Sequence, residues 1–222
     1  ADDPNNGVPR VKGVCGLEVT GAGHVMDGSP SEEPDFIGHF YFLPQFIEGA
    51  GTPELLIAYS DEEGTSELFS VKYDGANIIF DATAAGGTMT SFPADTTHWN
   101  LVEFDWHNNA SGSLWVNSDA TIDPPDATFT SGTGLVESVK LGAPNGLDGL
   151  VGIANFDEYV SKRDTFVGAL LMGDANGNGS LTIADVVALF NELNGTLAEG
   201  QPDCNMSGSI TIADVVCLFN AL

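Results

Sequence analysis

The feature that most constrains this sequence is a phrase that occurs twice near the C-terminus. Residues 174–193 and 203–222 align without a gap at an offset of 29 residues, and 14 of the 20 aligned positions are identical. Both copies place Asp, Asn, Gly and Asp at the same spacing, and both continue into the same apolar pattern. An internal duplication of this kind predicts two copies of one small structural unit.

Each copy places oxygen-bearing residues at the spacing of an EF-hand loop. In such a loop positions 1, 3, 5 and 12 supply side chains, and a glycine at position 6 permits the sharp turn. Position 7 supplies a backbone carbonyl, and position 9 often acts through water. The first copy offers Asp174, Asn176, Asn178, Ser180, Thr182 and Asp185. The second offers Asp203, Asn205, Ser207, Ser209, Thr211 and Asp214. The spacing predicts two bound Ca²⁺ ions, one per loop.

Calcium suits these donors better than other metals do. All of them are hard oxygens, whereas zinc sites use His and Cys, and magnesium prefers a tighter octahedron that keeps more water. Each loop has only two carboxylates, which suits weak binding in a calcium-rich extracellular fluid. The competing interpretation is a Gly/Asn-rich turn before a helix, with Asp as an ordinary N-cap.

The segments that follow the loops carry apolar residues at i, i+3, i+4 and i+7. These are Val186, Leu189, Phe190 and Leu193 in the first copy, and Val215, Leu218, Phe219 and Leu222 in the second. We expect two short amphipathic helices whose apolar stripes bury each other, because neither stripe can be buried within its own helix.

One helix after each calcium loop, Asp rather than Glu at position 12, and tandem duplication together resemble a type I dockerin over residues 173–222. The resemblance implies calcium-dependent docking onto a cohesin partner that holds a secreted protein on a scaffold. The family often has Ser/Thr pairs and Lys/Arg on its docking face. The corresponding positions here are Ile183-Ala184, Phe190-Asn191, Ile212-Ala213 and Phe219-Asn220. We therefore expect a less polar docking surface or an intramolecular packing role.

The chain has three cysteines, so at most one internal pair can form. Cys204 and Cys217 replace Ala175 and Ala188 of the first copy, which suggests a local disulfide that staples the second unit. Pairing of Cys15 with either of them, or buried free thiols, are the alternatives.

Residues 11–162 consist of short β-rich runs separated by turn residues such as Asp-Gly at 74–75 and Asn-Gly at 145–146. Nine such runs and no long helical pattern predict an antiparallel β-sandwich or jelly roll. In the run at 99–106, Trp99, Leu101, Glu103 and Asp105 share one face, and Val102, Phe104 and Trp106 share the other.

Two segments, "HWNLVEFDW…SGSLWVNSD" and "GLVGIANFDEYVSKR", resemble the laminin-G-like, concanavalin-type sandwich. The predicted fold class is therefore mainly β, with a small α-helical calcium module at the C-terminus. We expect an extended N-terminal arm at 1–10, the sandwich at 11–165, a linker at 166–172 and the calcium module at 173–222.

Charge excludes some partners. The sequence has 32 acidic and 6 basic residues, a net charge of −26, which repels nucleic acid and anionic lipid and favours cations. No apolar run reaches the length of a membrane span. The Gly- and Pro-rich composition and the start "ADDPNNGVPR" predict a secreted or cell-surface protein, with bacterial origin expected.

The sequence offers few candidate active-site residues. Glu103 and Asp105 lie on one strand face without the third acid of a glycosidase-type pattern, so a solvated sheet face is the favoured interpretation. Asp157 and Glu158 lie in a closing-strand pattern, "NFDEYV", which favours a structural role for both. The four histidines lack metal-ligand spacing, and no G-x-S-x-G or phosphate-binding loop occurs. Trp99, Trp106 and Trp115 are expected to be mainly core residues, with sugar stacking as the alternative.

Three functions remain open. The favoured one is a non-catalytic, calcium-binding assembly protein, in which the module and the N-terminal arm contact a neighbouring subunit and build a homo-oligomer or surface filament. The second is a carbohydrate-binding component on a cohesin scaffold, with a polysaccharide as partner. A glycan-active enzyme that uses Glu103 or Asp105 is the third.

Overall fold

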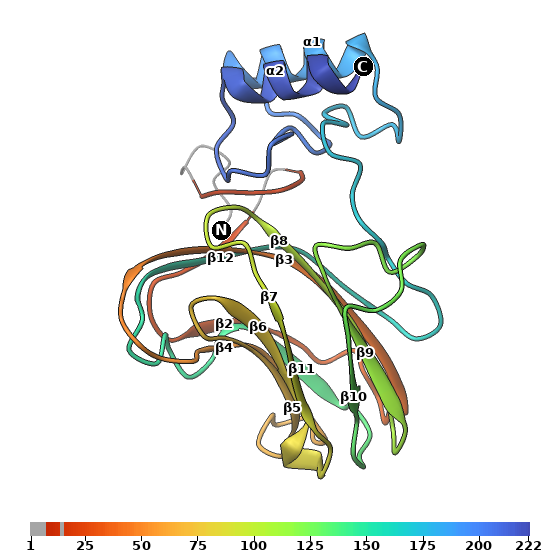
Figure 1. The fold of residues 1–222 in the computed structure, drawn as a ribbon. Helices are drawn as coiled ribbons and strands as arrows, with labels where there is room; N and C mark the ends of the chain where they lie inside the picture. The colour runs from red at the N-terminus through yellow and green to blue at the C-terminus, as the bar shows by residue number, and fades with distance from the viewer. Residues whose placement is uncertain (1–7, 14–15) are drawn as a thin grey trace.

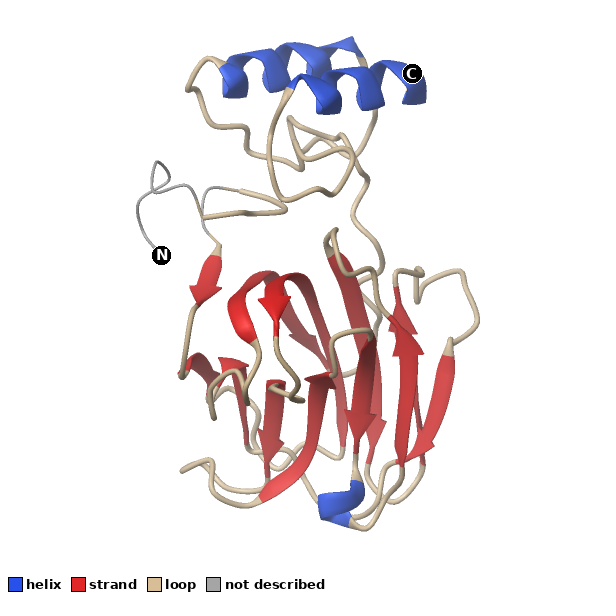
Figure 2. Cartoon of the chain, turned by 60° about the vertical axis from the view of Figure 1, so that its left-hand side comes forward, coloured by secondary structure: helices blue, strands red, loops and turns tan. Residues whose placement is uncertain are grey.

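The computed structural model describes residues 8–13 and 16–222. In this part of the chain two stacked antiparallel sheets are followed by two short helices (Figure 1). The fold is therefore mainly β, a sandwich followed by a small helical part, as the sequence predicts. In Figure 2 the helices lie together beyond one side of the sandwich.

Each sheet has six strands. Sheet A has the order β1 (Leu17–Val19), β12 (Val151–Lys162), β3 (Asp35–Glu48), β8 (Asn100–His107), β9 (Ser111–Val116) and β10 (Ala127–Thr130). Sheet B has the order β2 (Gly23–Asp27), β11 (Ser138–Ala143), β4 (Glu54–Tyr59), β5 (Glu67–Tyr73), β6 (Asn77–Asp81) and β7 (Met89–Pro93). A single 3₁₀ turn, Thr83–Ala85, joins β6 to β7, and the helices are α1 (Ile183–Leu193) and α2 (Ile212–Ala221).

Strand β8 shows how the sequence assigns side chains to the two faces of sheet A. Its residues Val102, Phe104 and Trp106 lie in the core between the sheets. Leu101 belongs instead to a separate cluster on the outer face of the sheet. The alternation predicted for residues 99–106 is confirmed, because successive strand side chains point to opposite faces.

An aromatic cluster fills the space between the sheets. Phe69 of β5 stacks on Trp106 and Phe80 at centroid distances of 4.9 and 5.0 Å, and it meets Phe104 edge-on at 5.4 Å. All four rings are fully buried. Contacts of this kind add to the burial of apolar area, so the sandwich has one continuous aromatic centre.

Three strands that the sequence patterns miss are β2, β7 and β10, and all three form an edge of a sheet. Their residues are mostly exposed or half-buried, so they carry no apolar alternation. Edge strands bury little and need no continuous apolar face, which removes the signal on which strand prediction depends.

A second apolar cluster lies between the helices and their loops, and a third covers the outer face of sheet A. The second contains Val186 and Leu189 of α1 with Val215 and Leu218 of α2. The third joins Tyr41, Leu43, Trp99 and Leu101 of the sandwich to Val11 and Met206. Within the described residues, no helix has the length and apolar content that crossing a membrane requires.

Replacing Phe69 should destabilise the whole sandwich. Phe69→Ala is expected to lower the free energy of unfolding by about 3 to 5 kcal/mol, because it opens a cavity among four packed rings. Val25→Ala, at a half-exposed position on edge strand β2, is the control and should change it by less than about 0.5 kcal/mol. Denaturant unfolding followed by tryptophan fluorescence measures both, and equal effects would contradict the central role of Phe69.

Candidate metal centre and its attachment to the sandwich

The two predicted loops have the same internal hydrogen bonds. Asp174 accepts bonds from the backbone N–H of Asn178 and Gly179 at 3.0 and 2.7 Å. Asp203 accepts the equivalent bonds from Ser207 and Gly208 at 3.0 and 2.6 Å. The first carboxylate of each loop therefore holds the turn of that loop by accepting two backbone hydrogen bonds.

The last carboxylate of each loop closes the same turn and begins the helix. Asp185 accepts bonds from the N–H groups of Asn176 and Thr182 at 3.1 and 2.8 Å. Thr182 is the N-cap of α1, and with Asp185 it forms a capping box. Thr211 and Asp214 do the same for α2. The side chain predicted as the last calcium ligand is thus also a helix-capping residue, so capping does not decide between the two interpretations of the loop.

Four carboxylates are concentrated in the loops, and none of them has an ion-pair partner among the described residues. Asp174, Asp185, Asp203 and Asp214 are all buried. Among the ion pairs of the described residues, none involves these four. Burial, together with the charge of Asp214, raises the pKa of Asp203 to about 7. A buried pair of acids without a counter-charge is costly, and a bound cation would remove that cost.

The donor set of each loop fits a hard cation. No three His, Cys, Asp or Glu side chains in the described chain gather as a metal-binding group. Each loop instead combines two carboxylates with the amide and hydroxyl oxygens at positions 3 and 5. In the first loop these are Asn176 and Asn178, and in the second Asn205 and Ser207. Ser180 and Ser209 occupy position 7, where the carbonyl is the expected donor. Such mixed oxygen sets are typical of calcium.

A disulfide joins Cys204 to Cys217, with a Cα–Cα distance of 5.9 Å. The bond ties the second loop to the middle of α2, which is the local pairing among the sequence-based alternatives. Cys15 lies outside the described residues. The first copy has Ala175 and Ala188 at the two equivalent positions, so only the second unit carries this cross-link.

The second loop is also the one that contacts the sandwich. The backbone N–H of Trp99 donates to the carbonyl of Met206 at 2.8 Å, and the Met206 side chain packs into the third cluster. Met206 has φ +60°, a left-handed conformation that the first copy gives to Gly177. A non-glycine residue here is strained, and the packing of its side chain against the sandwich offsets the strain.

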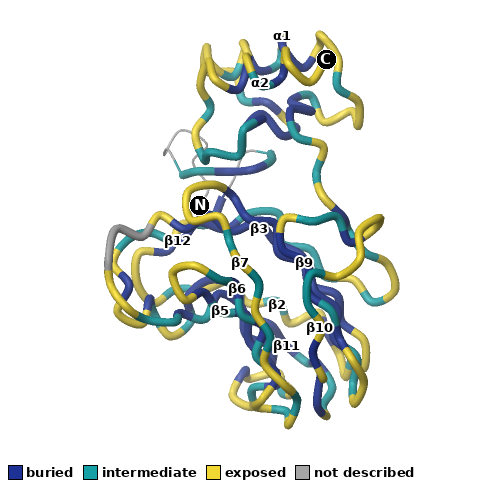
Figure 3. Tube along the Cα trace, in the orientation of Figure 1, coloured by how far each residue is buried: buried dark blue, intermediate teal, exposed yellow. Residues whose placement is uncertain are grey.

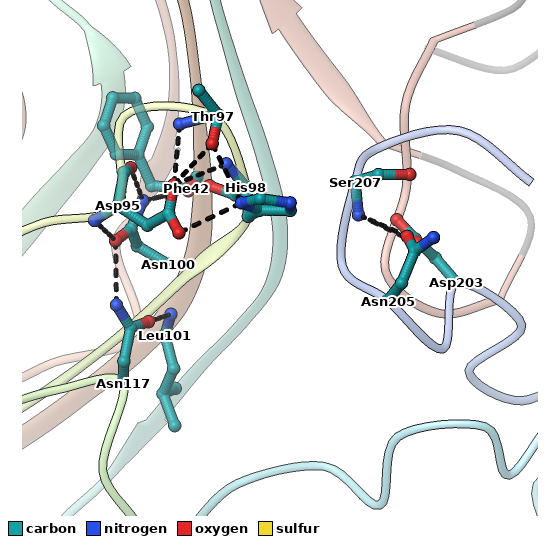
Figure 4. A network of polar contacts seen from close by, with 10 residues as sticks. All are labelled: Phe42, Asp95, Thr97, His98, Asn100, Leu101, Asn117, Asp203, Asn205 and Ser207. Atoms are coloured by element: carbon teal, nitrogen blue, oxygen red, sulfur yellow. Dashed lines mark hydrogen bonds and ion pairs between the residues drawn. The ribbon is translucent and has the colours of Figure 1, made fainter. Parts of the chain in front are cut away.

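The strand end that receives this loop is held by Asn100. Its side-chain amide donates to the carbonyls of Asp95 and His98, and its oxygen accepts from the N–H of Asp95 and from Asn117. Figure 4 shows this network, with Asp203, Asn205 and Ser207 of the second loop as a separate group to one side. The buried amide fixes the loop before β8, and therefore the position of Trp99.

Glu103 does not lie on a solvated sheet face, and that expectation is wrong. Its side chain is fully buried and accepts bonds from the N–H groups of Val167 and Gly168 at 2.6 and 3.0 Å. Nδ1 of His39 lies 3.4 Å from the same carboxyl group. The segment that connects the sandwich to the loops crosses this face and covers it. Asp105 is also buried, and burial raises its pKa.

Neighbouring side chains of sheet A also contact the segment that connects the sandwich to the loops. The hydroxyl of Tyr41 accepts a bond from the N–H of Leu170 at 3.0 Å, and burial raises the pKa of Tyr41 to about 12. Phe166 packs edge-on against Trp115 at 4.8 Å. The expected linker, 166–172, therefore follows the outer face of sheet A along its described length.

The N-terminal segment lies on the same face. Asp157 accepts bonds from the N–H groups of Val11 and Lys12 at 2.7 and 3.0 Å, and burial raises its pKa to about 6. Arg10 forms a buried ion pair of 2.6 Å with Glu192 of α1. Arg10 of the expected arm, and Val11 and Lys12 after it, are thus engaged within their own chain, while residues 1–7 lie outside the description.

All three tryptophans are buried, so none of them is a sugar-stacking platform. Trp106 lies in the main core, Trp99 in the third cluster, and Trp115 under Phe166. Their exposed fractions are at most 4%. The expectation that they are mainly core residues is confirmed.

Each helix has a second apolar stripe that the chain leaves exposed. Phe190, Leu193, Phe219 and Leu222 are exposed, so only part of the predicted stripe is buried between the helices. The exposed stripe of α1 also includes Ile183 and Val187, and that of α2 includes Ile212 and Val216. Figure 3 shows these outer helix surfaces as exposed. Two helices can bury only their facing sides, so apolar residues further around remain in solvent.

Comparisons with known proteins concern the sandwich. No protein-family model matches the chain, and no curated protein sequence matches it. A solved structure of the HCR/D W1238A mutant is similar with a TM-score of 0.50 and 8% identity, over 68% of this chain and 40% of that one. The chain therefore spans less than half of that structure's length. At such low identity the likeness shows the sandwich fold alone.

Two further solved structures are similar to the chain. The cellulose induced protein Cip1 has a TM-score of 0.49 and 11% identity, over 71% of this chain and 83% of that one. A Trypanosoma rangeli sialidase has a TM-score of 0.48 and 16% identity, over 68% of this chain and 26% of that one.

Removing the Glu103 carboxyl group should release the connecting segment. Glu103→Ala leaves two N–H donors without their acceptor and is expected to lower the free energy of unfolding by about 2 kcal/mol or more. The amides of Val167 and Gly168 should lose protection against hydrogen exchange. Glu62→Ala, at an exposed loop position, is the matched control. Unchanged exchange at Val167 and Gly168 would contradict the clamp.

Proposed function

We propose that the chain is a non-catalytic extracellular binding protein, in which a calcium-loaded C-terminal module attaches a lectin-like β-sandwich to a protein partner. The observation that carries the proposal is the pair of buried carboxylates in each of two matching loops, none of which forms an ion pair among the described residues. Calcium is the cation that the donors, their spacing and their number favour.

In this proposal each ion completes the fold of its own loop. The side chains of Asp174, Asn176, Asn178 and Asp185 hold the first ion, together with the Ser180 carbonyl and a water near Thr182. The equivalent residues of the second loop are Asp203, Asn205, Ser207, Ser209, Thr211 and Asp214. Two carboxylates per ion predict modest affinity, which suits an extracellular protein.

The attachment surface is the exposed apolar face of the helix pair. The same three residue types, Ile, Val and Phe, recur at i, i+4 and i+7 in both helices and remain exposed. Exposed apolar patches that repeat in this way are typical of protein interfaces. The resemblance of residues 173–222 to type I dockerins makes a cohesin-type domain the proposed partner.

Glycan binding by the sandwich is the second candidate function, and a specific feature favours it. An open groove with a cavity volume of about 600 Å³ lies on sheet B. The third cluster, which contacts the C-terminal module, lies on sheet A instead. A catalytic role is less well supported, because Glu103 and Asp105 are buried and already engaged by backbone N–H groups.

Self-assembly through the N-terminal arm has less support than attachment through the helices. Arg10, the last residue of the expected arm, pairs with Glu192, and the next two residues donate to Asp157, so this part of the N-terminal segment is occupied within its own chain. A filament therefore remains an outcome to be tested by the oligomeric state in calcium.

Calcium should bind with a stoichiometry of two and stabilise the chain. At a free concentration about 100 times the dissociation constant, each site should add about 2.7 kcal/mol to the free energy of unfolding. Asp185→Asn and Asp214→Asn should each reduce the stoichiometry in titration calorimetry from two ions to one. Asp164→Asn, at an exposed position, should leave it at two. Equal melting temperatures with calcium and with a chelator would contradict the proposal.

Charges placed on the helix face should abolish docking. In millimolar calcium, Val187→Asp with Val216→Asp is expected to weaken binding to a responsive cohesin domain at least tenfold, because the apolar contact is lost. Ile122→Asp, at an exposed position on the sandwich, is the control. Surface binding assays with a panel of cohesin domains, and sedimentation of the chain alone, measure the effect. A chain that stays monomeric and binds no cohesin would overturn the attachment role.

A further inference from the structure

The groove on sheet B is formed where strand ends meet two loops. Lys72, Ile79 and Asp81 line it from the outer face of the sheet, since the neighbouring Val71, Ile78 and Phe80 point into the core. Thr52 and Pro53 lie on one side, and a second loop contributes Asn145, Gly146 and Asp148. Its cavity volume, about 600 Å³, lies within the range of small-molecule sites.

A connected set of polar groups crosses the groove. Nζ of Lys72 lies 2.9 Å from Asp81 Oδ2 and 3.8 Å from Glu54 Oε1. Asn145 donates from Nδ2 to Glu54 Oε2 at 2.6 Å. These contacts hold four side chains, one each from β4, β5, β6 and the loop after β11, in fixed positions before any ligand binds. Such preorganisation lowers the entropic cost of binding.

An apolar surface lies beside these polar groups. Met89 of β7 is 61% exposed although it lines the groove, and it is paired in register with Asp81. Ile79 is half-buried next to it. A flexible, exposed methionine adapts to irregular apolar surfaces and gains burial when a ligand covers it.

The charges of the groove select the ligand. The lining has three carboxylates, Glu54, Asp81 and Asp148, and one ammonium group, which already pairs with two of them. With a net charge of −26 on the chain, an anionic ligand is repelled. In the described residues these acids do not converge as a metal-binding group. A neutral ligand rich in hydroxyl groups suits carboxylates that accept bonds, an ammonium and an amide that donate, and an apolar surface for C–H groups.

We propose that this groove binds a neutral oligosaccharide, with Asp81, Glu54 and Asn145 hydrogen-bonded to hydroxyl groups and Met89 packed against a ring face. The inference rests on the second candidate function, carbohydrate binding by the sandwich, and assigns that function a place and a ligand class.

The test is affinity electrophoresis of the full chain in calcium, followed by calorimetry with oligosaccharides of any polysaccharide that retains it. The probes are neutral mannan, xyloglucan, β-glucan and galactan, and the anionic alginate and pectin, with spermine as a competing cation. We expect retention by at least one neutral polysaccharide and none by the anionic ones. Met89→Ala and Asp81→Asn should each weaken binding about tenfold or more.

Matched controls separate the groove from general damage. Met26→Ala changes an exposed methionine on β2 of the same sheet, outside the groove, and Asp164→Asn changes an exposed acid. Neither should alter retention. If Met89→Ala and Asp81→Asn bind as the wild type does, the assignment of glycan binding to this groove is overturned, while glycan binding by the sandwich stands. If no neutral polysaccharide is retained, both fail. Binding of spermine or alginate alone overturns the ligand class.

Discussion

The attachment of the connecting segment and the C-terminal module to the outer face of sheet A governs the rest of the molecule. A sheet of this kind has one face in the core, and the other face usually meets water. Here that second face carries Glu103, Tyr41 and Asp157, whose oxygens accept bonds from the connecting segment and the N-terminal segment. Because these acceptors are buried, any movement that removes their donors leaves polar groups unsatisfied. The face is therefore a buried contact that holds both the N-terminal segment and the connecting segment.

The two repeats have diverged where their surroundings differ. The loop hydrogen bonds and the capping boxes are the same in both, which is expected if each loop must fold around the same kind of ion. The second copy alone has a disulfide, and it alone has a left-handed methionine that packs on the sandwich. The disulfide lies in the cluster between the helices and their loops, whereas Met206 lies in the cluster on the outer face of sheet A. The first loop remains the less modified copy.

Local patterns predict most of the fold, and they also propose the loop residues of the candidate metal centre. The alternation in β8, the two helices and the loop spacing are all short-range signals, so they can be found without coordinates. The edge strands β2, β7 and β10 have no such signal. The burial of Glu103 cannot be predicted from local pattern, because it depends on a segment about 64 positions further along the chain. The alternation within a strand does not show whether a distant segment covers one of its faces. The apolar stripes on α1 and α2 show the opposite case. Their pattern predicts complete burial, but each helix packs against the other on one side only, so part of each stripe stays exposed.

The placement of the helix pair gives the molecule a direction. The third cluster joins the module to the outer face of sheet A, and the groove opens on the outer face of sheet B, so the sandwich separates them. The described chain also begins on the module side, where Arg10 meets Glu192. Anything bound by the exposed helices would hold the sandwich from behind and leave sheet B facing outward. A row of such chains on a common support would then display one kind of surface to the surrounding medium, and crowding at the point of anchorage would not obstruct it.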